Sequence, residues 1–210
     1  MLALRKLEHR QDTPADEDDV VYLSEATWAD YQRLVAIRGD RSAPRITYLQ
    51  GLLELMSPSR SHDVIKSRIG RLVEVYCLER GIEFDACGSW TIGDRRAKRG
   101  AEPDECYVFH GIENPKRPDL AIEVVWSSGR IDKLDVYRKL GVREVWYWRR
   151  GEPRRIQPYV LQAERYRASK RSKVLPGIDL AQLVGFVDLP TASQAIRAYR
   201  AELVRGQRLP

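Results

Sequence analysis

Two aspartates that each follow a proline and open an apolar run mark the part of the chain that could do chemistry. They are Asp104, in EPDECYVF, and Asp119, in RPDLAIEVVW; the second run also carries Glu123, and Lys133 follows in DKLDVYRKLGV. Hard cations such as Mg²⁺ take oxygen ligands, usually one or two carboxylates plus waters and phosphate oxygens. A nearby ammonium stabilises charge that builds on a phosphate during hydrolysis. The pattern therefore favours metal-dependent cleavage of phosphodiesters.

Strands and one short helix are expected to position these residues. The apolar runs at 102–109 and 120–126 predict strands, and the nearly continuous second run is typical of a strand covered on both faces. Residues 130–140 predict a helix that ends at Gly141, and residues 145–148 a further strand. A strand, helix and strand of this length imply a parallel pair with a right-handed crossover.

Glu123 is the most informative of the acidic residues, because it interrupts an otherwise apolar run. An ionised carboxylate in a buried strand is costly unless it binds a metal or pairs with a cation such as arginine. Asp104 lies on the preceding strand, so we expect its carboxylate within about 6 Å of that of Glu123, close enough to share one ion. Asp119 lies about 13 Å along the strand from Glu123 and is interpreted as a cap at the start of that strand.

The rest of the chain predicts further elements around this centre. Residues 24–37 show helical spacing of apolar residues, and residues 45–49 and 52–56 predict a hairpin across Gln50-Gly51. A long helix is expected from an N-cap at Ser61 to about Arg80. Further elements are an edge strand at 157–161 and a C-terminal helix at 191–204.

Length and composition indicate a single globular domain. The chain has 210 residues, of which 43% are hydrophobic and 31% charged, enough to bury a core without disulfides. We expect a flexible N-terminal tail at 1–22, the domain at 23–190, and a C-terminal helix and tail at 191–210. No apolar run approaches the length of a membrane span and no signal peptide is recognised, so a cytoplasmic protein without a membrane partner is expected. The three cysteines show no zinc-like spacing and are interpreted as reduced thiols.

The charge balance is compatible with a polyanionic partner. The net charge is +6, and arginines dominate the basic clusters at 95–99, 149–150 and 154–155. Arginine matches phosphate geometry, although solvated loops explain each cluster equally well. Trp146 and Trp148 point to one face of their expected strand, where core packing is favoured over base stacking.

Two long segments resemble a known family. The run PDLAIEVVWSSGRIDKLDVYRKLGVREVWYW is similar to the signature of the Uma2-like restriction endonuclease family (DUF820), part of the PD-(D/E)XK nuclease superfamily. The run ITYLQGLLELMSPSRSHDVIKSRIGRLV is similar to that family's hairpin, Ser-Pro loop and His-led helix. The similarity covers roughly residues 24–188. It implies an α/β fold with a restriction-endonuclease-like mixed β-sheet flanked by helices, with an N-terminal helix and hairpin.

The resemblance also implies a catalytic centre. Asp104 matches the aspartate after proline, and Glu123 matches the acidic residue that begins Glu-x-Lys on the next strand. Val125 occupies the lysine position, so the nearest replacement is Lys133 on the following helix; Lys139 is the weaker candidate.

Two upstream residues are further candidates. Glu54 matches an acidic position of the family's hairpin and is a candidate metal ligand, with a solvent-facing strand residue as the alternative. His62 heads the long helix, where a catalytic or phosphate-contacting role competes with that of an ordinary residue at a helix start.

The leading hypothesis is a DNA endonuclease that uses Mg²⁺ or Mn²⁺. Asp104, Glu123 and Glu54 would hold the metal, and Lys133 would orient the attacking water. The second hypothesis is a catalytically inactive nuclease fold that binds DNA or a protein, because Val125 departs from the motif. The third is a plain interaction protein whose acids pair with arginines. DNA is the expected partner, and homodimerisation is left open.

Overall fold

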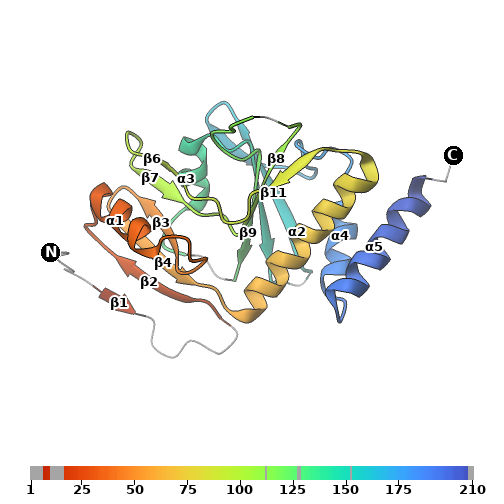
Figure 1. The fold of residues 1–210 in the computed structure, drawn as a ribbon, viewed down its shortest axis with the longest axis horizontal. Helices are drawn as coiled ribbons and strands as arrows, with labels where there is room; N and C mark the ends of the chain where they lie inside the picture. Colours follow the sequence, from red (N-terminus) through yellow and green to blue (C-terminus); the bar gives the residue numbers. More distant parts are fainter. Residues whose placement is uncertain (1–6, 10–16, 112, 127–128, 152, 208–210) are drawn as a thin grey trace.

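The expected mixed α/β fold is confirmed, and its strands divide into two sheets rather than one. The computed structural model describes residues 7–9, 17–111, 113–126, 129–151 and 153–207. Within these residues, one sheet has the strand order β1-β2-β4-β3-β7-β6 and the other the order β12-β11-β10-β9-β8-β5. The sheet that contains β2 and β4 lies toward the N-terminus, and β9 of the other sheet lies between α3 and α2 (Figure 1).

The first sheet is built around the predicted hairpin. Its strands are β1 (Leu7–His9), β2 (Asp19–Leu23), β3 (Arg45–Leu49), β4 (Leu52–Ser57), β6 (Ile92–Asp94) and β7 (Arg99–Ala101). The β3–β4 hairpin is confirmed, and Gln50 and Gly51 both have positive φ, +46° and +105°, as tight hairpin turns of this length require.

The N-terminal boundary differs from the prediction. Residues 19–22 belong to β2 instead of a tail, because this strand pairs with β4 along its whole length. Its five residues, DVVYL, show no alternation of polar and apolar residues, so the strand is hard to recognise without its partner. Residues 1–6 and 10–16 of the expected tail, and 208–210 at the other end, lie outside the described residues.

The second sheet carries the candidate acidic residues. Its strands are β5 (Phe84–Ala86), β8 (Glu105–Phe109), β9 (Leu120–Val125), β10 (Glu144–Arg149), β11 (Arg155–Gln162) and β12 (Arg165–Ala168). The predicted parallel pair is confirmed, since β9 and β10 run parallel with α3 between them in the chain. The strand predicted at 157–161 is present as β11, but its predicted edge position is wrong, because β12 pairs with the outer side of β11.

Caps account for where the helices begin. The helices are α1 (Trp28–Arg38), α2 (Arg60–Arg80), α3 (Lys133–Leu140), α4 (Leu180–Val187) and α5 (Ala192–Gln207). Helix α1 begins later than predicted because Thr27 and Asp30 form a capping box. The N-cap of α2 is Ser59 instead of Ser61, since the Ser59 side chain accepts a hydrogen bond from the His62 backbone N–H.

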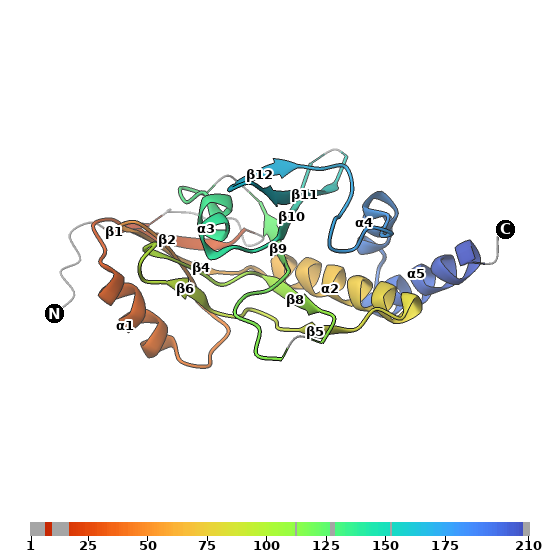
Figure 2. The ribbon, with the colours of Figure 1, turned by 90° about the horizontal axis from the view of Figure 1, so that it is seen from above.

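The two faces of the second sheet are covered differently. Trp146 and Trp148 point to the face packed by α2, α4 and α5, where both are buried, so the core interpretation of these residues is confirmed. Ala121, Val145 and Tyr147 point to the opposite face, where they pack against α3. In the second view α3 lies on the other side of β9 from α2 (Figure 2). None of the helices in the described part of the chain is long and apolar enough to cross a membrane.

Candidate functional site

Glu123 and Lys133 form a buried ion pair between β9 and the first turn of α3. Glu123 is 1% exposed, and the Lys133 Nζ lies 2.7 Å from its Oε2. The Tyr137 hydroxyl donates a hydrogen bond to the other oxygen of Glu123. Lys133 and Tyr137 are four residues apart and therefore lie on the same face of α3. One helix face thus neutralises and fixes a carboxylate that interrupts an apolar strand.

Glu54 approaches the same lysine from the first sheet. It lies in β4 directly opposite Tyr22 of β2 and is only 6% exposed, so the solvent-facing alternative is wrong. Burial raises the pKa of Glu54; Lys133 and Tyr22 counteract this, while Glu123 adds to it. Burial alone would lower the pKa of Lys133, but the two carboxylates outweigh it and raise that pKa. Acidic residues from two sheets therefore both act electrostatically on Lys133, and Glu123 is the one in direct contact with its ammonium.

Asp104 has a different set of partners. It is fully buried and forms an ion pair with Arg45, while its Oδ2 lies 2.9 Å from His62 Nε2. The same oxygen accepts a hydrogen bond of 2.6 Å from the backbone N–H of Val124, the residue that follows Glu123. Asp104 does not lie in a strand as predicted but directly before β8, beside β9, which carries Glu123; each of the two carboxylates is bound to its own cation.

His62 links Asp104 to the N-terminal segment. Its Nδ1 lies 2.7 Å from the Asp18 carboxylate, and its ring is fully buried at the start of α2. Asp18 also accepts a hydrogen bond from the Ser59 backbone N–H, so it holds the first turn of α2 in place. His62 therefore connects two carboxylates.

Asp119 stands apart from this group. Its Oδ2 accepts a hydrogen bond from the Phe109 backbone N–H at 3.0 Å, and its Oδ1 lies 3.1 Å from Arg143 Nη1. These contacts fasten the start of β9 to β8, as expected of a cap at the start of a strand. Lys139 is exposed on α3, whereas Lys133 on the same helix reaches the acidic residues.

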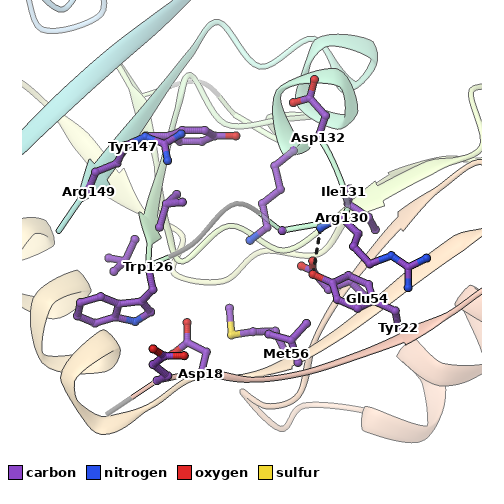
Figure 3. Close-up of a pocket in the computed structure, with 16 residues that line it drawn as sticks. Asp18, Tyr22, Glu54, Met56, Trp126, Arg130, Ile131, Asp132, Tyr147 and Arg149 are labelled. Atoms are coloured by element: carbon purple, nitrogen blue, oxygen red, sulfur yellow. Dashed lines mark hydrogen bonds between the residues drawn. The ribbon is translucent and has the colours of Figure 1, made fainter. Parts of the chain in front are cut away.

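A pocket of about 700 Å³ opens over this ion-pair cluster. Glu54 and Lys133 line it, and Glu123 is buried behind Lys133. The close-up shows Trp126, Tyr147 and Arg149 on one side of the pocket, with Tyr22, Glu54 and Arg130 on the other (Figure 3). Four carboxylates line the pocket, namely Glu17, Asp18, Glu54 and Asp132.

Glu54 and Glu123 are better placed to bind a divalent cation than Asp104 is. Within the described residues, no group of three or more His, Cys, Asp or Glu side chains is arranged to hold a metal ion. Mg²⁺ needs only one or two protein carboxylates, however; Glu54 lines the pocket, and Glu123 is paired with Lys133, which also lines it. A cation at Asp104 would have to displace Arg45 or His62, because both bind that carboxylate.

Sequence reasoning missed several partners in the site. Tyr137 carried a usable signal, since it lies one helical turn after Lys133. No local sequence pattern marks Arg45, Asp18 or Tyr22 as part of the site. Their roles depend on which strands of the first sheet face α2 and α3.

The fold and the pocket together define a restriction-endonuclease-like α/β protein, with acidic residues in β4, in β9 and directly before β8, and a lysine from the helix between β9 and β10. Residues 28–190 match the model of the family Uma2, described as putative restriction endonuclease. The chain belongs to the Uma2 family. A search of curated proteins found no match. Among solved structures, a putative nuclease belonging to DUF820 from Anabaena variabilis is 15% identical, with 85% of this chain and 99% of that chain covered and a TM-score of 0.47.

Proposed function

We propose that this protein is a divalent-metal-dependent endonuclease that hydrolyses DNA phosphodiesters with Mg²⁺ or Mn²⁺. The observation that carries the proposal is the position of Lys133, whose ammonium is paired with Glu123 and lines the same pocket as Glu54. Membership of the Uma2 family supports the same chemistry. A cytoplasmic location and DNA as the partner belong to this proposal.

Each residue has a distinct part in the proposed reaction. Glu123 and Glu54 would hold the cation, and Asp104 would join them once its carboxylate is released from Arg45. A bound divalent cation supplies positive charge for the phosphate and lowers the pKa of a water molecule. Lys133 would orient the attacking water and stabilise negative charge on the phosphate oxygens. Tyr137 would keep the Glu123 carboxylate in one orientation.

The electrostatics of the pocket make a cation necessary for this substrate. Four carboxylates line the pocket against three basic side chains, those of Arg130, Lys133 and Arg149. Burial and the neighbouring Glu123 both raise the pKa of Glu54, so excess negative charge is unfavourable there. A phosphodiester adds a further negative charge and would be repelled until a divalent cation balances these groups.

A specific observation favours a second candidate, a catalytically inactive nuclease fold that binds DNA or a protein. The Asp104 carboxylate is occupied by Arg45, His62 and a backbone N–H, and Val125 stands where the motif has lysine. In such a protein the acidic residues would serve only as partners of buried cations. It would bind DNA without cleaving it and would not need to bind Mn²⁺ tightly.

Cleavage of supercoiled plasmid and of circular single-stranded DNA tests the proposal. We expect cleavage with Mg²⁺ or Mn²⁺ that EDTA abolishes and that Glu123→Gln, Asp104→Ala and Lys133→Ala each reduce by at least about 100-fold. Lys139→Ala is the matched control, because Lys139 is exposed on the same helix, and it should cleave like the wild type.

Two further measurements separate the candidates. Calorimetric titration with Mn²⁺ should show binding in the wild type and weaker binding in Glu123→Gln. DNA affinity should fall steeply as salt rises, because phosphate contacts release counterions. DNA binding with neither Mn²⁺ binding nor cleavage would establish the inactive DNA-binding fold. Absence of DNA binding at low salt would refute the endonuclease and leave an inactive fold that binds a protein.

A further inference from the structure

Three arginines at the candidate site each lie over the ring of an aromatic residue. The guanidinium carbon of Arg130 lies 5.2 Å from the ring centre of Tyr22, that of Arg149 5.1 Å from Tyr147, and that of Arg150 5.1 Å from Trp126. All three rings line the same pocket. Trp126 and Tyr147 lie on one side of it and Tyr22 on the other (Figure 3). Arginines and aromatic rings therefore border the same pocket that the carboxylates line.

The reactive groups are recessed in this pocket. Glu54 is 6% exposed and Glu123 is 1% exposed, and Glu123 lies behind Lys133, which lines the pocket. A volume of about 700 Å³ falls in the range of roughly 300–1,000 Å³ that is typical of small-molecule pockets. One or two nucleotides fit a space of this size, but a duplex does not. A phosphate in an intact duplex would therefore stay outside, away from the acidic residues.

Aromatic walls also favour a strand whose bases are free. In a duplex, neighbouring base pairs cover both faces of each base, so a base can stack on a side chain only when it is unpaired. Proteins that bind single strands combine aromatic stacking platforms with basic groups that follow the backbone. Tyr22, Trp126 and Tyr147 supply the first, and the arginines over them supply the second.

We propose that this pocket takes an unpaired DNA strand, so that the substrate is single-stranded DNA or the unpaired segment of a flap or bubble. The proposal rests on the proposed function, because it names the substrate class of the same site. Trp126 is the main stacking platform, since this residue lines the pocket and is partly exposed, whereas Tyr147 is only 7% exposed. The carboxylates that line the pocket require a divalent cation for tight binding.

Binding without cleavage provides the test. The affinity of the full chain for a fluorescent single-stranded DNA is compared by anisotropy, at physiological salt with Ca²⁺, with its affinity for the same sequence as a blunt duplex. We expect the single strand to bind at least about tenfold more tightly, since one stacked base accounts for a difference of that order. A duplex with an unpaired flap should bind like the single strand.

Two comparisons assign the preference to the aromatic pocket. Trp126→Ala should weaken single-strand binding about tenfold and leave duplex binding nearly unchanged. The control is Leu78→Ala, an apolar side chain that is 70% exposed on α2 and does not line the pocket. If Trp126→Ala fails to fold, the wild type is tested with an oligonucleotide that has abasic positions. This strand keeps its phosphates but lacks the stacking bases, and the wild type should bind it about tenfold more weakly.

The outcomes that overturn the proposal are distinct from failure of the nuclease assignment. Equal or tighter binding of the blunt duplex, or unchanged affinity for the abasic strand, would refute an unpaired substrate whether or not the protein cleaves DNA. Tighter binding of the same sequence as RNA would refute the choice of DNA. Single-strand preference without metal-dependent cleavage would support the pocket assignment and refute only the proposed catalytic function.

Discussion

The Lys133 ammonium lies 2.7 Å from the Glu123 carboxylate, and this contact joins the start of α3 to the middle of β9. Glu123 and Val125 are two residues apart in a strand, so their side chains point to the same face. A lysine at position 125 would therefore face the same side as Glu123, where Val125 now lines the pocket. Helix α3 packs on that face and brings an ammonium to the acidic residue from a different element.

Replacement of Lys133 should affect both stability and activity. Lys133→Ala leaves Glu123 buried without its cation, which should lower the free energy of unfolding by about 3–5 kcal/mol. Mn²⁺ should restore part of this loss if Glu123 and Glu54 bind it, because a ligand that binds only the folded state stabilises it. Thermal melts with and without Mn²⁺ measure both effects. Lys139→Ala is the control and should change the free energy of unfolding by less than about 0.5 kcal/mol. If Mn²⁺ stabilised the Glu54→Gln variant as much as the protein with Glu54, this would contradict Glu54 as a ligand.

Glu123 and Lys133 should be strongly coupled in a double-mutant cycle. Glu123→Gln strands a buried ammonium and Lys133→Met strands a buried carboxylate, so each single change should be destabilising. The double variant removes both charges, and its loss should be smaller than the sum of the two by at least about 1 kcal/mol. Urea unfolding of the four proteins gives the coupling free energy. Additive losses would show that the ion pair does not account for the buried charge.

The contribution of Asp135 to the stability of α3 in the fold should be lost at acidic pH. Burial raises the pKa of Asp135, but hydrogen bonds from Arg99 and Arg138 outweigh it and hold this pKa below its usual 3.8. The folded-state pKa is lower than the unfolded one, so this stabilisation is present above 3.8 and is lost as the pH falls through the folded value.

Thermal melts over a pH series check this expectation. Asp135→Asn should melt below the wild type at neutral pH, and the difference should shrink in the acidic range. Glu202→Gln serves as control, because the Glu202–Arg205 pair lies on the surface of α5 and contributes little. A melting difference that stays constant down to the acid transition would mean that Asp135 acts by packing and not by charge.

Cys87 should be the reactive thiol of this protein. The neighbouring Cys106 thiol lowers the pKa of Cys87 to about 7 against the opposing effect of burial, whereas burial raises the pKa of Cys77 to about 12. Alkylation requires the thiolate, so iodoacetamide should modify Cys87 first, with a rate that rises through about pH 7. Peptide mass spectrometry after timed labelling measures this rate. Cys106→Ala should move the midpoint toward the ordinary value of 9.0; an unmoved midpoint would assign the shift to another group.

Local patterns in the sequence were sufficient for the elements that carry the candidate residues. Alternation and the Gln50-Gly51 turn predict the β3–β4 hairpin, and the apolar run predicts β9 as a buried strand. The strand, helix and strand order predicts the parallel β9–β10 pair, because only one hand of crossover packs well. Strand alternation also places Trp146 and Trp148 in the core. Each of these depends on residues close together in the chain.

The tertiary structure alone decided which charges meet. The sequence indicated that Glu123 needs a metal or a cation, and the fold gives it Lys133 and Tyr137. Asp104 is bound instead by Arg45 and His62, which come from β3 and α2. These pairings depend on how two sheets and the helices between them are placed in space, a long-range arrangement that no local periodicity encodes. Desolvation then fixes the outcome, because a buried carboxylate must take the cation that the neighbouring elements present.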